Sequence, residues 1–128
     1  MPSRSRLQRY GIGTLLLGVL LALYGCEGEP QAKKARYMQK GLAYMAERKY
    51  TAAVLEFKNA VQLDPNDAQA HYQLGLAHLQ LTAEPRDRGT LTDLRAAFRA
   101  LHRSVQLDAK NLDAQLKLGE LYLLAKDA

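Results

Sequence analysis

The chain repeats itself, and this repetition restricts its fold more than any other feature of the sequence. Two segments recur closely and a third more loosely: VQLDPN (61–66) as VQLDAKN (105–111), YQLGLAHL (72–79) as LKLGELYL (116–123), and QKGLAYM (39–45). Gly41 and Gly75 are 34 residues apart, whereas Gly75 and Gly119 are 44 apart, so ten residues are inserted in the second unit. Such a period indicates supersecondary units that bury a core by stacking on one another.

The periodicity within the units is helical, which predicts an all-α fold. In YTAAVLEFKNAVQL the apolar residues fall on one helical face: Tyr50, Ala53, Val54, Phe57 and Val61. Pro65 ends this helix, because the residue before a proline avoids the α region. Asp67 and Asn111 are expected to be the N-caps of the helices that follow.

The pattern of large and small residues resembles the tetratricopeptide repeat (TPR). Residues 34–67 carry its motif positions with one departure, Lys40 for leucine: Tyr37, Gly41 and Tyr44, then Ala53, Phe57, Ala60 and Pro65. Residues 68–111 give a second copy: His71, Leu74, Gly75 and His78, then Ala97, Leu101 and Ser104. Residues 112–128 give only a first helix, with Gln115, Leu118, Gly119 and Tyr122. The resemblance implies a helix-turn-helix solenoid of about two and a half repeats.

The repeated glycines are expected where neighbouring helices approach closely. Gly41, Gly75 and Gly119 each lie inside a predicted helix, where glycine costs about 1 kcal/mol relative to alanine. We predict that the inserted segment, residues 82–90, forms a loop, since Pro85 and Gly89 interrupt any helix. This loop is either solvated and self-neutralising or a contact for a partner. Thr90 and Asp93 resemble a capping box for the next helix.

The first 25 residues predict a lipoprotein signal peptide. Three arginines precede an uncharged, largely apolar run, and Leu23 to Cys26 resemble the lipobox of bacterial lipoproteins. This resemblance implies acylation of Cys26, a short linker over residues 26–33, and anchoring in a membrane. Glu27 in place of aspartate favours the outer membrane. Two alternatives remain: a short uncleaved anchor, or a cysteine with no lipid.

Charge and motifs exclude several function classes. The net charge of +5 falls to +2 without residues 1–25, because they contain three arginines and no acid, so no nucleic-acid footprint remains. His71 and His78 share a helical face but lack a third metal ligand, and packing is the expected role. Arg95, Arg99 and Arg103 form a stripe that is either solvated or meets an acidic lipid or polysaccharide. We expect no catalytic site, metal or cofactor.

The family resemblance implies a concave groove that binds a protein segment, either extended or helical. The predicted groove consists of residues from the three first helices: Met38, Leu42, Met45, Gln69, Tyr72, Gln73, Leu76, Gln80, Asp113, Leu116, Lys117 and Glu120. We also expect the last helix to expose Leu118, Leu121, Tyr122 and Ala125 unless further repeats follow.

The layout as a whole resembles TPR lipoproteins of exopolysaccharide and PEP-CTERM protein-sorting systems. The expected function is therefore an envelope adaptor that is lipid-anchored, faces the periplasm and binds proteins. Two alternatives are an accessory lipoprotein of outer-membrane or pilus assembly, and the regulatory N-terminal part of a larger enzyme.

Overall fold

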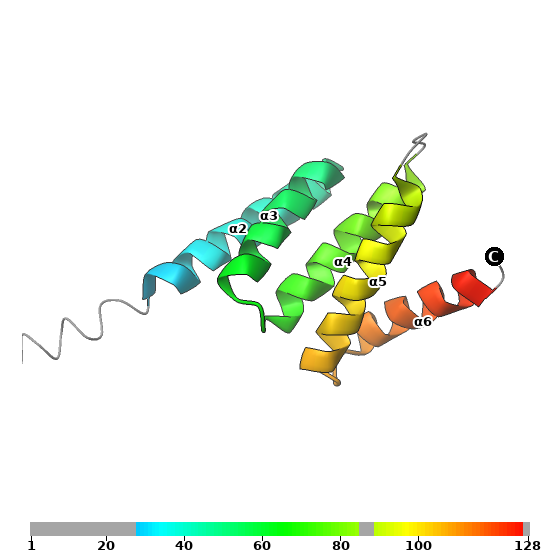
Figure 1. Cartoon of the computed structure of the whole chain (residues 1–128). Helices are drawn as coiled ribbons and strands as arrows, with labels where there is room; N and C mark the ends of the chain where they lie inside the picture. The colour runs from blue at the N-terminus through cyan, green and yellow to red at the C-terminus, as the bar shows by residue number, and fades with distance from the viewer. Residues whose placement is uncertain (1–27, 85–88, 127–128) are drawn as a thin grey trace, which may run out of the picture. The chain divides into compact units, whose positions relative to one another are not determined.

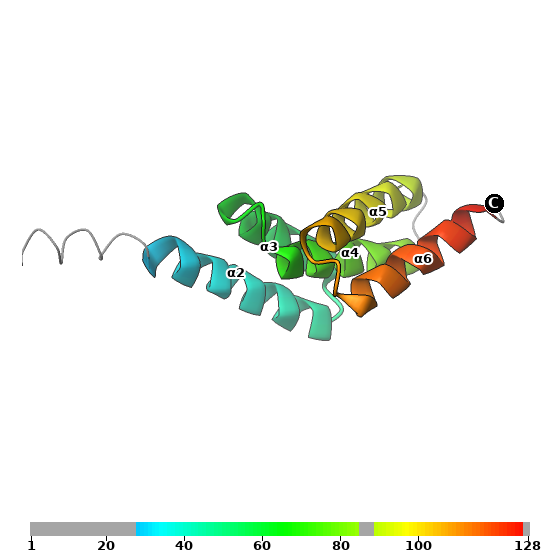
Figure 2. The same cartoon turned by 90° about the horizontal axis from the view of Figure 1, so that it is seen from below.

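The computed structural model describes residues 28–84 and 89–126, and every regular element within them is an α-helix. The helices in chain order are α2 (Gly28–Ala46), α3 (Tyr50–Leu63), α4 (Ala68–Ala83), α5 (Thr90–Leu107) and α6 (Leu112–Lys126). Figures 1 and 2 show them as successive hairpins, with α4 and α5 side by side in both views. The predicted all-α repeat architecture is confirmed.

The chain divides into two units, which we describe separately. Residues 33–128 form one unit and contain all the packing discussed below. Of residues 1–32 the structure describes only 28–32, the first residues of α2. The predicted signal peptide, Cys26 and residues 85–88 of the inserted segment lie outside the described residues.

Helix α2 begins earlier than the sequence interpretation placed it. We assigned residues 26–33 to a linker, whereas the helix already includes Gly28. Glu29 lies in the first turn, where a negative charge complements the helix dipole. Pro30 also lies in this turn, where its missing amide hydrogen costs nothing. Helix-favouring residues follow at once, so nothing in this stretch delays the helix.

The first hairpin closes around a contact between a glycine and an aromatic ring. Gly41 is buried on α2, and a Cβ atom placed there would come within 2.7 Å of Cδ1 and Cζ of Phe57 on α3. Phe57 itself is fully buried. Because glycine leaves out the side chain that would hold the helices apart, the ring packs directly against the backbone of α2. The predicted close approach at Gly41 is confirmed.

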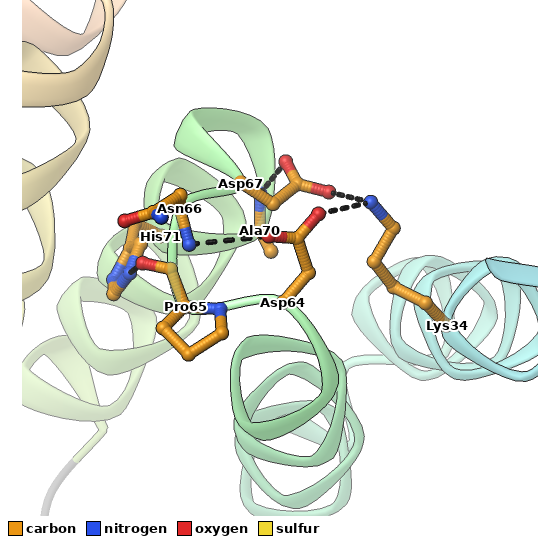
Figure 3. A network of polar contacts seen from close by, with 7 residues as sticks. All are labelled: Lys34, Asp64, Pro65, Asn66, Asp67, Ala70 and His71. Atoms are coloured by element: carbon orange, nitrogen blue, oxygen red, sulfur yellow. Dashed lines mark hydrogen bonds and ion pairs between the residues drawn. The ribbon is translucent and has the colours of Figure 1, made fainter. Parts of the chain in front are cut away.

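The turn between α3 and α4 is held by an ion-pair network that we call the Lys34 bridge. Lys34 Nζ on α2 lies 2.8 Å from Oδ2 of Asp64 and 2.7 Å from Oδ2 of Asp67 (Figure 3). Asp67 also caps α4, since its Oδ1 accepts from the Ala70 amide at 3.0 Å. The predicted cap is confirmed. The role of Lys34 could not be predicted from local sequence, because its partners are 30 and 33 residues away.

The Lys34 bridge shifts the pKa of all three groups. The hydrogen bond from Lys34 holds the pKa of Asp64 below its ordinary value. Burial would raise the pKa of Asp67, but the hydrogen bonds from Lys34 and Ala70 outweigh it and the pKa is lowered. The two carboxylates in turn raise the pKa of Lys34. All three groups are therefore more firmly charged in the folded chain.

The second hairpin corrects our prediction for the ten inserted residues. We assigned the insertion to a loop over about residues 82–90, but seven of the ten inserted residues lengthen the two helices. Helix α4 continues eight residues beyond Gly75, whereas α2 continues five beyond Gly41. Helix α5 begins eleven residues before Leu101, whereas α3 begins seven before Phe57. Only three of the ten residues lengthen the connection, because leucines and alanines on either side of it extend the helical pattern.

The glycine contact of the first hairpin recurs in the second. A Cβ atom at Gly75 would lie 2.7 Å from Cγ of Leu101, which is fully buried. Ser104, one turn further along α5, is also fully buried and donates its hydroxyl to the Ala68 carbonyl at 2.9 Å. This hydrogen bond satisfies the buried hydroxyl and ties α5 to the start of α4.

The predicted capping box at Thr90 and Asp93 is wrong. Gly89 is the N-cap of α5, and Thr90 is its first helical residue. The Asp93 carboxylate instead accepts a hydrogen bond from Nδ1 of His78 on α4, with the two atoms 2.9 Å apart. His78 is buried, so its ring nitrogen needs a partner, and the lengthened helices bring Asp93 within reach.

Helix α6 packs on α5 through residues that we expected to be exposed. Asn111 caps α6, as predicted, with its Oδ1 accepting from the Ala114 amide at 3.0 Å. Leu118 and Leu121 are buried in a cluster with Ala97 and Leu101 of α5, which corrects the expectation that they face solvent. Tyr122 and Ala125 are exposed as expected, and further apolar residues of α6 are exposed as well: Leu112, Leu116, Leu123 and Leu124.

Candidate functional site

The first helix contributes less to the predicted groove than the sequence suggested. Met38 and Met45 are half-buried and pack against the cluster of Ala53, Val54 and Phe57. Leu42 is exposed over 46% of its surface. The two methionines therefore contribute mainly to the interior of the first hairpin, and Leu42 is the most exposed of the three predicted groove residues of α2.

Helix α4 contributes a mixture of amide and apolar side chains. Gln69 and Gln80 are exposed, whereas Gln73 and Leu76 are half-buried. Tyr72 is also half-buried and packs against the cluster that contains Leu101 and Leu118.

The predicted groove residues of α4 and α6 lie close enough to influence one another. Burial raises the pKa of the Tyr72 phenol, and the negative charge of Asp113 raises it further, against an opposing effect of Lys117. Lys117 Nζ donates to Oε2 of Glu120 at 2.9 Å, and this contact, followed by smaller effects of Tyr72 and Asp113, raises the pKa of Lys117. The Tyr72 phenol of α4 therefore lies near the charges of Asp113 and Lys117 on α6.

A hollow runs along the exposed side of α6. It has a volume of about 770 Å³ and is lined by three predicted groove residues, Asp113, Leu116 and Glu120, together with Leu112, Gln115, Gly119 and Leu123. A Cβ atom at Gly119 would meet nothing within 4 Å, unlike one at Gly41 or Gly75. The hollow therefore lies open beside Gly119, whereas Phe57 packs against the equivalent Gly41 and Leu101 against Gly75.

The two histidines of α4 pack within the protein, as predicted. Nε2 of His71 lies 3.0 Å from the Pro65 carbonyl oxygen, which can only accept, so this nitrogen donates. Burial lowers the pKa of His78, although the Asp93 carboxylate acts in the opposite direction. Within residues 28–84 and 89–126, no group of three or more histidine, cysteine, aspartate or glutamate residues could hold a metal ion.

The three arginines of the α5 stripe have different surroundings. Arg103 donates from Nη2 to Oδ1 of Asn66 at 3.1 Å. Arg95 lies beside a hollow between α5 and α6 that is lined mostly by apolar side chains, including Phe98 and Leu121. Arg99 borders this hollow as well as a second cleft towards α3.

Among the helices that the structure describes, none is long and apolar enough to cross a membrane.

Comparison with known proteins agrees with the fold. Residues 41–81, which extend from the glycine of α2 to the last buried leucine of α4, match the family model described as TPR repeat. No curated protein matches the chain. The match and the stacked hairpins together support a TPR protein, and repeats of this family suggest a role in protein–protein interaction.

Proposed function

We propose that this chain is an adaptor that binds a segment of a partner protein on the face formed by α4 and α6. The observation that carries the proposal is that Tyr72 of α4 packs against the cluster that contains Leu118 of α6, which brings its phenol near the charges of Asp113 and Lys117. Beside it, Leu116 is exposed over 62% of its surface. An apolar side chain next to paired charges of both signs suits a peptide that offers an apolar anchor and polar backbone groups.

The partner segment is extended or helical. Exposed amides of Gln69 and Gln80 can hydrogen-bond a backbone, and exposed Leu42 and Leu116 can contact apolar side chains. This mixture favours a segment that alternates apolar and polar residues over a purely charged one.

We further propose that acyl chains on Cys26 hold the adaptor in a bacterial envelope membrane, facing the periplasm and preferentially at the outer membrane. The support is the sequence: three arginines, an uncharged run, and the lipobox-like Leu23 to Cys26. Two or more acyl chains anchor a protein stably, whereas one gives only marginal binding. Exopolysaccharide export and PEP-CTERM sorting are the pathways favoured by resemblance. Outer-membrane or pilus assembly, and regulation of an attached enzyme, are the alternatives.

Crosslinking in cells tests partner binding with a matched pair of variants. Leu116→Glu places a charge on the proposed binding face, whereas Leu55→Glu changes an equally exposed leucine (59%) on α3. We expect Leu116→Glu to lose a specific crosslinked protein that wild type and Leu55→Glu both retain. Equal retention by both variants would remove the binding face from the proposal.

The anchor has a separate test. We expect the mass of the N-terminal peptide to carry acyl groups on Cys26, and Cys26→Ser to move the protein from the membrane to the soluble fraction. An unmodified Cys26 in membrane-bound protein would refute lipidation and favour the uncleaved anchor. The identity of a captured partner then distinguishes export, assembly and enzyme regulation.

A further inference from the structure

A cleft on the opposite side of α4 from the proposed binding face gathers basic side chains from three helices. It has a volume of about 260 Å³ and lies between α3 and α5, with α4 as its third wall. Five of its lining residues are basic: Lys58, His71, His78, Arg99 and Arg103. Leu74 and two alanines of α5 are the other described residues of the lining, so no carboxylate from the described part of the chain lines the cleft.

The permanent charges of this cleft form no ion pair with an acid in the described part of the chain. Among residues 28–84 and 89–126, no ion pair involves Lys58, Arg99 or Arg103. Arg103 donates to the neutral amide of Asn66, which leaves its charge uncompensated. Lys58 and Arg99 also contribute to lowering the pKa of His78, after the larger effect of burial, so both lie close enough to impose a positive potential there. Asp93 is hydrogen-bonded to His78.

We propose that this cleft binds a phosphate group, supplied either as free phosphate or as a phosphomonoester lipid headgroup. Three permanent positive charges match the two negative charges of a phosphomonoester better than the single charge of a carboxylate. Arginine also presents parallel donors that fit phosphate oxygens. A cleft of this volume holds the anion with several waters.

The two histidines are placed to respond to the anion. His71 donates from Nε2 to a carbonyl, and His78 donates from Nδ1 to Asp93, so each ring keeps its second nitrogen for a proton. A bound phosphate brings a negative charge beside both rings, which changes the surroundings that their NMR signals report. His102 does not line the cleft and stacks on Phe98 instead, so it provides an internal reference.

Titration of the three histidine Hε1 signals by NMR tests the proposal on the full-length chain in neutral detergent. Sodium phosphate is added at constant ionic strength, with sodium chloride as the control salt, and soluble dihexanoyl phosphatidic acid is the second probe. We expect saturable shifts of the His71 and His78 signals and little change at His102. Response to both probes means that phosphate alone suffices, whereas response to the lipid alone assigns the headgroup as the ligand.

Two arginines one helical turn apart supply the matched variants. Arg99 lines the cleft, whereas Arg95 on the same helix does not, and both side chains are exposed. We expect Arg99→Gln to raise the dissociation constant about tenfold, or about 1.4 kcal/mol, and Arg95→Gln to leave it within twofold. Lys58→Gln is a second test from α3, and circular dichroism verifies folding. Equal weakening by Arg95→Gln, equal shifts at all three histidines, or no shift with either probe would overturn the proposal. The result does not depend on the proposed adaptor function, which concerns a different face.

Discussion

The three repeated glycines occupy equivalent positions, yet alanine should affect them in opposite directions. At Gly119 a Cβ atom meets nothing within 4 Å, so Gly119→Ala gains only the helix propensity, up to about 1 kcal/mol. At Gly41 the same atom overlaps three ring carbons of Phe57, which is fully buried. Overpacking of this kind costs about 1–3 kcal/mol, and the severe overlap favours the upper end.

The net expectation is therefore a difference in sign. After subtraction of the propensity gain, Gly41→Ala should destabilise the fold by about 2 kcal/mol. Gly75→Ala should also destabilise it, because Cγ of Leu101 lies 2.7 Å and its backbone nitrogen 3.3 Å from the added carbon. Backbone cannot move aside as a flexible side chain can. Gly119→Ala should stabilise it.

Thermal unfolding followed by far-UV circular dichroism separates these outcomes. For a domain of this size, 1 kcal/mol shifts the midpoint by about 4–8 °C. We expect Gly119→Ala to raise the midpoint by up to this amount and Gly41→Ala to lower it by about twice as much. A rise of similar size in all three variants would refute the close-approach argument, because helix propensity alone would then explain the series.

Three further predictions concern polar groups at helix ends and in the interior. Asn111→Ala removes the N-cap of α6 and should cost about 1 kcal/mol in urea unfolding. Lys34→Met removes the Lys34 bridge and should lower the free energy of unfolding. Because both carboxyl pKa values lie below their unfolded value of 3.8, this loss of stability relative to wild type should be complete above pH 3.8 and should shrink as the pH falls below it. Burial lowers the pKa of His78, so stability should fall as the pH drops below 6.5, and His78→Asn, which keeps a donor for Asp93, should remove this dependence.

The repeat contacts could be predicted because sequence spacing encodes them. A glycine on the first helix and a large apolar residue on the second recur together, as Gly41 with Phe57 and Gly75 with Leu101. The N-caps at Asp67 and Asn111 were equally predictable, since a cap acts within three residues of its own position. Contacts and caps of this kind can be predicted from the local sequence and the repeat period alone.

The partner of Asp93 could not be predicted in this way. A carboxylate in the first turn of a helix can complement the helix dipole, cap the backbone or reach another element. The outcome depends on how the ten inserted residues divide between α4, the connection and α5. This division sets the position of Asp93 along the helix axis relative to His78. The basic cleft could not be predicted either, because Lys58, His71 and Arg99 are distant in sequence and lie together only after the hairpins stack.

The packing of α6 is predictable from the repeat register, although not from the composition of the helix. Helix α6 has leucines on every side, so its apolar pattern does not select one face. The repeat offset of 44 residues does: the buried residues Ala70 and Ala77 correspond to Ala114 and Leu121, which are also buried. The same offset maps Gly75 onto Gly119, whose side of the helix is open along the hollow. In a repeat protein the register of a neighbouring unit therefore identifies the buried face more reliably than the composition of the helix itself.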